Sequence, residues 1–230
     1  MPCYELPLDD GNVRVTGSVD RVDIMEKDGV KYLRVIDYKT GEKEFKLSKL
    51  LQGLNIQMVL YLMALEKNGE ALYGKTVPAG VLYLPSRIGI KSYLSERSPD
   101  VDKSEAERKN AGKLSGMVLN SPVVLNGMGV DKNPKYFPVS FDTKGNIAGN
   151  FYSLENFRVL SEKIDDKIKE MGNGLHNGNI PVLPAESSGK TPCVFCDYRS
   201  VCGHEDGDEV NKIISISHNK VLEDLEAENE

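Results

Sequence analysis

The chain has 230 residues, of which 40% are hydrophobic and 28% charged, as in an ordinary soluble protein with one large or two small domains. No apolar run is long enough to cross a membrane, and the N-terminus lacks the basic and apolar regions of a secretory signal. We therefore expect a cytoplasmic protein. The net charge of −6 does not indicate nucleic-acid binding, although a local basic stripe would be enough to follow phosphates.

The first structured region is predicted to be a β-hairpin, with one strand running from residue 13 past Asp20 and a second ending at Asp37-Tyr38-Lys39. The turn-like sequence Glu26-Lys27-Asp28-Gly29 joins the two strands. An antiparallel hairpin brings Asp20 and Asp37 to the same end of the sheet, and Lys39 lies on the same strand face as Asp37. Two carboxylates suit Mg²⁺ or Mn²⁺, and a lysine can stabilise charge during phosphodiester hydrolysis. The alternative is a solvated, salt-bridged surface.

A long amphipathic helix is predicted from Phe45 to about Gly69, with Ser48 as a candidate N-cap. Gln57 and Tyr61 are four residues apart and therefore share one face of this helix. The apolar run 77–84 predicts a buried strand that returns to the sheet after the helical crossover. This order of elements predicts an α/β fold with a mixed central sheet flanked by helices.

The second half of the chain is less regular. We expect a further strand near 86–93, a polar insertion at about 95–113, a Gly- and Asn-rich stretch with a short apolar turn at 114–135, and a strand at 136–141. A helix opened by Ser153 and closed by Gly172 follows, and a Pro/Gly/Ser-rich connector comes after it. These features divide the chain into a core, 1–190, and a C-terminal segment with an acidic tail, 191–230.

Three of the four cysteines have the spacing C-x2-C-x5-C, at Cys193, Cys196 and Cys202. Thiolates on adjacent turns can share a metal, so this pattern indicates a zinc site or a [4Fe–4S] cluster in a reducing compartment. The alternative, buried structural thiols, fits poorly with the polar neighbours. A fourth ligand is needed. His204 is a weak candidate, because a lone histidine beside an acidic tail is usually exposed. Cys3 is another candidate, and its distance in sequence argues neither for nor against it.

The segments GSVDRVD, VIDYKTG and QMVLY, followed by the cysteine pattern, together resemble one known family. They are similar to the C-terminal nuclease domain of AddB-type (RexB-like) subunits of helicase–nucleases, in the RecB-like branch of the PD-(D/E)xK nucleases. The resemblance covers about residues 13–202 and implies a restriction-endonuclease-like core. It also implies metal binding by Asp20, Asp37 and the Tyr38 carbonyl.

The same resemblance assigns roles to other residues. Lys39 would be the catalytic lysine, and Gln57 and Tyr61 match a Q-x3-Y motif that helps to position the lysine and the DNA. The three clustered cysteines would be ligands of a [4Fe–4S] cluster with a structural role.

The implied activity is that of a Mg²⁺- or Mn²⁺-dependent deoxyribonuclease of exonuclease type. It would digest single-stranded DNA delivered by an A-type helicase–nuclease subunit, during recombinational repair of double-strand breaks. No Walker A sequence is present, so ATP hydrolysis would belong elsewhere.

The chain departs from the family pattern at its start. The family's upstream helix, with a metal-binding His or acidic residue, and the first cluster cysteine have no counterpart here. We therefore expect a core truncated at its N-terminal side, a fourth cluster ligand outside this fragment, and little activity from the fragment alone. Two other functions stay open: a CRISPR-associated or standalone RecB-like exonuclease, and a non-catalytic DNA-binding or scaffolding module.

Overall fold

A computed structural model of the chain describes residues 1–40, 44–85, 113–130, 136–141, 147–205 and 207–227. The strand predicted at 86–93 lies outside these ranges, and so does the insertion predicted at about 95–113 except for its last residue. Within the described residues, no helix is both long enough and apolar enough to span a membrane.

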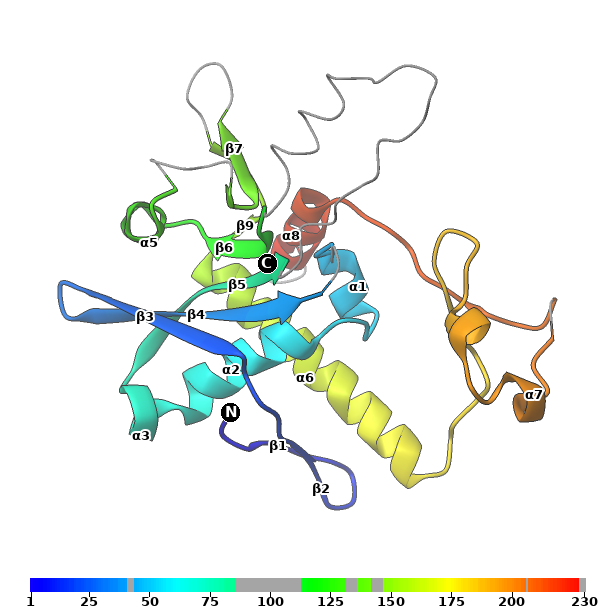
Figure 1. Ribbon diagram of the computed structural model, residues 1–230. Coiled ribbons are helices and arrows are strands. Elements are labelled where there is room, and N and C mark those ends of the chain that lie inside the picture. Colours follow the sequence, from blue (N-terminus) through cyan, green and yellow to red (C-terminus); the bar gives the residue numbers. More distant parts are fainter. Residues whose placement is uncertain (41–43, 86–112, 131–135, 142–146, 206, 228–230) are drawn as a thin grey trace, which may run out of the picture.

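The centre of the molecule is a mixed five-stranded sheet with the order β3-β4-β5-β6-β9 (Figure 1). The strands are β3 (Arg21–Lys27), β4 (Val30–Lys39), β5 (Thr76–Pro85), β6 (Ser115–Leu119) and β9 (Phe151–Tyr152). β4 pairs antiparallel with β3 and parallel with β5, and β5 pairs antiparallel with β6. The predicted mixed sheet and its helical crossover are therefore confirmed.

The predicted hairpin is confirmed as β3–β4, and its turn has the geometry that the right-handed strand twist favours. Lys27 pairs with Val30, so the connection is the two residues Asp28 and Gly29. Both have positive φ angles, 51° and 76°. An Asp-Gly pair with two positive φ angles is the preferred short hairpin connection.

The first predicted strand is in fact two strands in different sheets, which corrects the sequence prediction. Residues Asn12–Val15 form β2, which pairs with β1 (Tyr4–Pro7) in a separate two-stranded sheet. The chain then leaves strand geometry at 16–20 before β3 begins. The valine alternation continues through this bend, so it gave no sign that the strand partner changes.

The predicted long helix is also interrupted. It consists of α1 (Leu47–Leu51) and α2 (Gln57–Asn68), followed by the short α3 (Glu70–Tyr73). The break contains Gly53 and Asn55, with φ angles of 80° and 59°, which no right-handed helix can accommodate. Ser48 is not the N-cap; it lies buried inside α1, and Lys46 precedes the helix.

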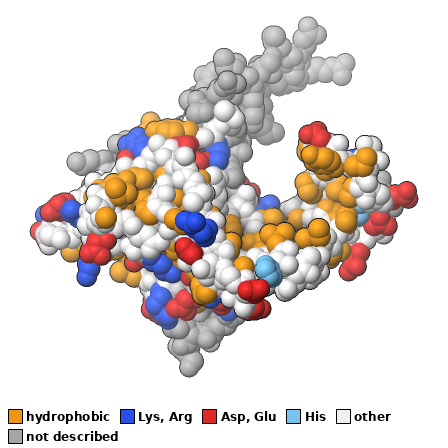
Figure 2. Space-filling model, turned by 90° about the horizontal axis from the view of Figure 1, so that it is seen from below, with side chains coloured by type: hydrophobic (Ala, Val, Ile, Leu, Met, Phe, Trp, Pro, Cys, Tyr) orange, Lys and Arg blue, Asp and Glu red, His pale blue; other side chains and the backbone are white. Residues whose placement is uncertain are grey.

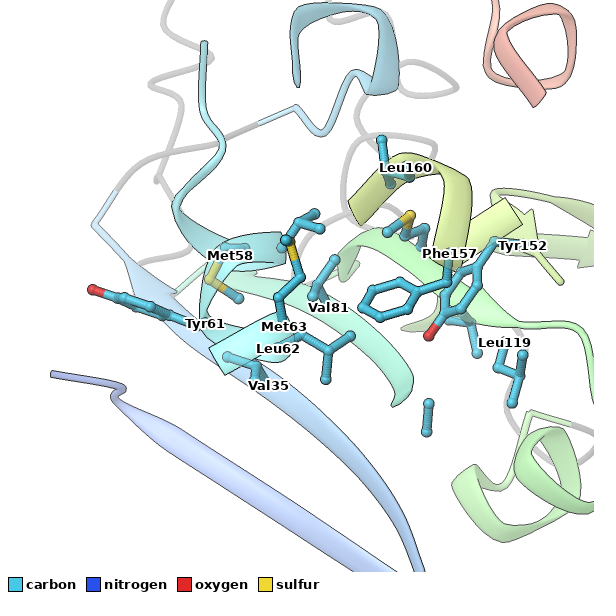
Figure 3. Close-up of a cluster of buried hydrophobic side chains, with 14 of the residues drawn as sticks. Val35, Met58, Tyr61, Leu62, Met63, Val81, Leu119, Tyr152, Phe157 and Leu160 are labelled. Atoms are coloured by element: carbon cyan, nitrogen blue, oxygen red, sulfur yellow. The ribbon is translucent and has the colours of Figure 1, made fainter. Parts of the chain in front are cut away.

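The hydrophobic core lies between the sheet and the helices α2 and α6 (Leu154–His176). Figure 3 shows Phe157 of α6 pointing toward Val81 of the sheet, with Leu62 and Met63 of α2 nearby. Ser153 caps α6 as predicted: its hydroxyl accepts from the Asn156 N–H at 3.0 Å in a capping box. The two helices thus cover one face of the sheet.

Helix α6 does not stop at Gly172, as the sequence suggested, but continues to His176. A Cβ at position 172 would lie 2.9 Å from the Leu8 side chain. This glycine therefore allows the turn between β1 and β2 to approach the helix, and it does not end the helix.

The Gly- and Asn-rich stretch contains more structure than predicted, because β6 and α5 (Pro122–Met128) both lie in it. The strand expected at 136–141 is the shorter β7 (Val139–Phe141), which pairs with β8 (Ile147–Gly149). Between α6 and the last helix, the described residues form only short elements: β10 (Ala185–Glu186), η2 (Pro192–Phe195), α7 (Arg199–Cys202) and β11 (Asn211–Lys212). The last helix is α8 (His218–Ala227). Figure 1 shows α7 well apart from the central sheet, whereas α8 returns to pack on α1 and α6.

Candidate active site

The C-terminal end of β4 carries an ion pair in which the carboxylate is buried and the ammonium is partly exposed. Asp37 and Lys39 are two residues apart, so both side chains leave the same face of the strand, while Tyr38 lies exposed on the other face. Asp37 is 5% exposed, and its Oδ2 forms an ion pair with the Lys39 ammonium. A buried carboxylate is costly without such a partner. The pair therefore differs from the solvated surface pair that was the alternative prediction.

Asp20 lies at the same end of the sheet as this pair, as the hairpin predicted. It directly precedes Arg21, which pairs with Ile36 across β3 and β4. The Asp20 Oδ2 accepts a hydrogen bond from the Tyr38 backbone N–H at 3.0 Å. This bond occupies one of the two carboxylate oxygens and holds Asp20 at the end of β4.

The Gln57–Tyr61 pair lies in the first turns of α2, beside the segment that leads to Asp20. Gln57 Nε2 donates to the Tyr61 hydroxyl at 2.8 Å. The Tyr61 ring is buried, but Figure 3 shows its oxygen pointing away from the hydrophobic cluster. A Cβ at Gly17 would lie 3.1 Å from both the Tyr61 hydroxyl and its Cε1. The absence of a side chain at Gly17 thus lets the tyrosine pass close to the segment that carries Asp20.

The sequence analysis did not select Tyr83, which lies directly beside the ion pair. Tyr83 is paired with Asp37 in the parallel register of β4 and β5, and the Lys39 Nζ lies 5.7 Å from its ring centroid. Burial, with a contribution from the negative charge of Asp37, raises the pKa of Tyr83 to about 12. Only the register between two strands far apart in sequence reveals this residue.

Arg21, the residue after Asp20, forms its contacts away from the Asp37–Lys39 pair. It pairs with Ile36 and so faces away from Asp37, and its Nε donates to Asp23 at 2.7 Å. Arg34 donates to the same carboxylate at 2.7 Å. Burial opposes ionisation of Asp23, but the hydrogen bonds from the two arginines outweigh it and lower its pKa. Arg21 is therefore part of an ion-pair network on the opposite face.

The oxygen donors at the end of β4 suit a hard divalent cation. Asp20 and Asp37 supply two carboxylates, and the Tyr38 carbonyl is the third predicted ligand. Among the described residues, no three or more His, Cys, Asp or Glu side chains form a group that could hold a metal ion. Mg²⁺ is commonly bound through one or two carboxylates, with waters and substrate phosphates completing its shell. The two carboxylates therefore fit Mg²⁺ or Mn²⁺.

The three clustered cysteines lie on the C-terminal segment, with Cys193 in η2, Cys196 just after it and Cys202 in α7. None of the three forms a disulfide, and Cys196 and Cys202 are exposed. Their thiols have the chemistry of zinc or iron–sulfur ligands. Because no metal-holding group of His, Cys, Asp or Glu forms within the described ranges, the cluster stays a prediction.

Two features of this segment differ from a simple exposed tail. The His204 side chain is only 12% exposed, and its Nδ1 lies 3.5 Å from Asp208 Oδ2, so the expectation of an exposed histidine was wrong. Figure 2 shows hydrophobic side chains gathered on the arm at the right of the view. The segment's exposed apolar residues include Phe195, which is 90% exposed, with Val194, Tyr198 and Val201.

Similarity to known proteins extends over nearly the whole chain. The sequence model of the PD-(D/E)XK nuclease superfamily matches residues 3–203, which include every candidate residue of the hairpin, α2 and the cysteine pattern. The chain belongs to the PD-(D/E)XK nuclease superfamily. The mixed sheet flanked by helices agrees with this fold.

Several curated relatives of this nuclease superfamily member are named as the B-type subunit of an ATP-dependent helicase/deoxyribonuclease. The protein from Clostridium kluyveri is 32% identical over 218 residues, covering 92% of this chain and 19% of the relative. The one from Thermoanaerobacter sp. is 30% identical over 226 residues, covering 95% and 19%. The one from Listeria welshimeri is 29% identical over 213 residues, covering 89% and 18%. The chain thus spans about a fifth of the length of the curated relatives that it matches.

Proposed function

We propose that this PD-(D/E)XK nuclease is the nuclease domain of a B-type helicase–nuclease subunit, and that it hydrolyses DNA phosphodiester bonds with Mg²⁺ or Mn²⁺. One observation carries the proposal: the buried Asp37 forms an ion pair with Lys39 at the end of β4, where the Tyr38 backbone N–H also binds the Asp20 carboxylate. The names of the relatives favour this function over a CRISPR-associated or standalone exonuclease.

In the proposed mechanism, residues on and around β4 have different roles. Asp20, Asp37 and the Tyr38 carbonyl would hold the divalent cation, which supplies a polarised phosphate and an acidified water. Lys39 places its ammonium next to Asp37, where it can orient the attacking water and offset the charge that develops on the phosphate. Gln57 fixes the Tyr61 hydroxyl beside the segment that carries Asp20, and so helps to position the DNA and the lysine.

The substrate and partner follow from the same assignment. We infer that the domain acts as an exonuclease on single-stranded DNA that an A-type subunit delivers, within recombinational repair in the cytoplasm. The relatives' printed names join helicase to deoxyribonuclease, which supports a motor-coupled reaction. Because the sequence has no Walker A loop, ATP hydrolysis would belong to another part of the assembly.

A [4Fe–4S] cluster on Cys193, Cys196 and Cys202 is the proposed cofactor of the segment 191–230. Its role would be structural, because the described stretch around the cysteines has only the short elements η2 and α7, and several large apolar side chains there are exposed. The fourth ligand would lie outside this chain. Iron and acid-labile sulfide measured after anaerobic purification would support the proposal, and loss of both in Cys196→Ser would locate the cluster. Stoichiometric zinc without iron would contradict it.

The activity is tested by digestion of labelled single-stranded DNA with Mg²⁺ or Mn²⁺. We expect Asp37→Ala and Lys39→Ala each to lower the rate at least about a hundredfold, the usual effect of removing a group that stabilises the transition state. EDTA should abolish cleavage. Lys27 and Asp28 form the matched control, because they are an exposed Lys–Asp pair with atoms 3.7 Å apart at the turn of the same hairpin.

The control variants distinguish a nuclease from a non-catalytic scaffolding module. Lys27→Ala and Asp28→Ala should retain full activity and full Mn²⁺ binding, whereas Asp37→Ala should weaken Mn²⁺ binding measured by calorimetry. Cleavage that survives Asp37→Ala would refute the assignment of the site. If the wild-type chain does not cleave DNA, the same assay is repeated on a longer protein of the relatives' length. Absence of cleavage there as well would refute the proposed nuclease activity.

A further inference from the structure

We propose that Tyr83 is a positioning residue for Lys39, and that its ring face, together with Asp37, holds the ammonium where the phosphate reacts. The inference rests on the proposed nuclease function and adds a residue to its site. No motif of the sequence analysis includes Tyr83.

The placement of Tyr83 follows from the sheet. β4 and β5 run parallel, and their register sets Tyr83 beside Asp37 and Pro85 beside Lys39. Side chains at paired positions project from the same face of a sheet. The Lys39 Nζ accordingly lies 5.7 Å from the Tyr83 ring centroid, within the range of about 6 Å over which an aromatic face attracts an ammonium.

The ring is itself held firmly. Tyr83 is 3% exposed and packs against Phe45, with ring centroids 6.5 Å apart. Phe45 is fixed in turn, because its backbone N–H donates to Ser115 Oγ at 2.8 Å, and Ser115 is the β6 residue paired with Tyr83. A firmly packed aromatic ring therefore lies beside Lys39, whose four-carbon side chain is otherwise flexible.

The Lys39 ammonium needs a second contact because Asp37 has two proposed roles. The carboxylate that pairs with Lys39 is also a proposed metal ligand, and a bound cation competes with the ammonium for the same oxygens. The ring face does not take part in that competition. Burial and the Asp37 charge raise the pKa of Tyr83 to about 12, so the phenol is neutral at neutral pH and attracts the lysine through its π face.

The test compares Tyr83→Leu, which removes the ring, with Tyr83→Phe, which keeps it. With saturating Mn²⁺ we expect Tyr83→Leu to lower kcat about tenfold with little change in KM, as loss of a desolvated cation–π contact implies. Tyr83→Phe should stay within about twofold of wild type. Tyr152→Leu is the matched control: Tyr152 is an equally buried tyrosine of the sheet whose hydroxyl donates to the Pro78 carbonyl.

A readout independent of activity is the NMR signal of the Lys39 ε-methylene in ¹³C-lysine-labelled protein, assigned with Lys39→Arg. The ring current should displace this signal in wild type and Tyr83→Phe, and the displacement should vanish in Tyr83→Leu. If Tyr83→Leu does not fold, phenylalanines with increasing fluorination at position 83 keep the shape while weakening the π face. We then expect kcat to fall stepwise with fluorination.

The outcomes separate the two proposals. A wild-type protein that cleaves DNA, with kcat and the Lys39 signal unchanged in Tyr83→Leu or across the fluorinated series, would overturn the role of Tyr83 and leave the nuclease intact. A loss of kcat of equal size in Tyr152→Leu would also overturn it. If a longer protein of the relatives' length also shows no nuclease activity, while the Lys39 signal still depends on the ring, the proposed function is refuted and the contact is supported.

Discussion

At the scale of single residues, the proposed nuclease site includes a close contact at one position that carries no side chain. Gly17 lies against Tyr61, three residues before Asp20, and an added methyl group would lie 3.1 Å from both the Cε1 ring atom and the hydroxyl oxygen of Tyr61. Tyr61 is buried on its other side by the core, so it has little room to retreat. The glycine, the tyrosine and Gln57 therefore act as one packed unit.

We predict that Gly17→Ala destabilises the protein by about 1–3 kcal/mol, the usual cost of overpacking, and lowers nuclease activity. Tyr61→Phe removes the hydroxyl, one of the two clashing atoms, so the double variant should lose less stability than the sum of the single variants. Urea denaturation of the four proteins measures this coupling. Strict additivity would show that Gly17 and Tyr61 are independent.

The proposed catalytic residues could be identified from sequence because each lies in a local motif. Asp20, Asp37 and Lys39 are brought together by one hairpin, and Gln57 and Tyr61 by one turn of helix. Tyr83 could not be found in this way, since its contact depends on the register of two strands joined by a long crossover. The cysteine ligands stay a prediction.

At the scale of elements, hydrophobic patterns predicted the correct types of structure but not the breaks in them. Hydrophobic spacing continues across the bend at 16–20 and across the break between α1 and α2, so periodicity alone predicts one strand and one helix. The break was signalled by Gly53 and Asn55, two residue types that readily adopt positive φ angles. β6 was missed because its partners come from distant parts of the chain.

The last helix provides a prediction about pH. His218 begins α8 and its Nε2 lies 2.7 Å from the Phe151 carbonyl of β9, while its Nδ1 is buried with no hydrogen-bond partner in the described part of the chain. Burial lowers the pKa of His218 below its ordinary value of 6.5, although the bond to Phe151 opposes this shift. The unfolded chain therefore binds the proton more tightly, and stability should fall as the pH drops below about 6.5.

We expect His218→Gln to reduce this loss of stability at acidic pH. The reduction is at most about 1.4 kcal/mol per pH unit for a single proton. The measurement is the free energy of unfolding in urea between neutral and mildly acidic pH. His176→Gln is the control, because His176 is an exposed side chain on α6. Identical pH profiles for wild type and His218→Gln would show that this histidine is not the group responsible.

At the scale of the whole molecule, the α/β class and the mixed sheet could be predicted, because strand, hairpin, crossover helix and strand follow each other in sequence. The attachment of the N-terminal β1–β2 hairpin could not be predicted from the sequence. β1 and β2 form their own sheet and contact α6, a helix more than 130 residues later in the chain. No local pattern specifies such a contact, and it depends instead on a buried polar network.

That network consists of Tyr4 on β1, Lys67 on α2 and Asp165 on α6. The Tyr4 hydroxyl donates to Asp165 Oδ1 at 2.7 Å, and the Lys67 ammonium donates to the hydroxyl at 2.8 Å and to Asp165 Oδ2 at 3.1 Å. Tyr4 and Asp165 are both buried. Burial raises the pKa of Tyr4 to about 12, so the phenol stays protonated and remains a donor at neutral pH. The carboxylate is thus the acceptor that joins three separate elements.

We predict that Asp165→Asn lowers the free energy of unfolding by about 1–3 kcal/mol, because buried donors lose their charged acceptor. The adjacent Asp166 is the matched control, since it is exposed and pairs with Lys169 at 3.4 Å on the surface of the same helix. Asp166→Asn should change stability by less than about 0.5 kcal/mol. Urea denaturation measures both, and limited proteolysis should show the β1–β2 hairpin cut first in Asp165→Asn. Equal losses in the two variants would mean that the hairpin is held by apolar packing alone.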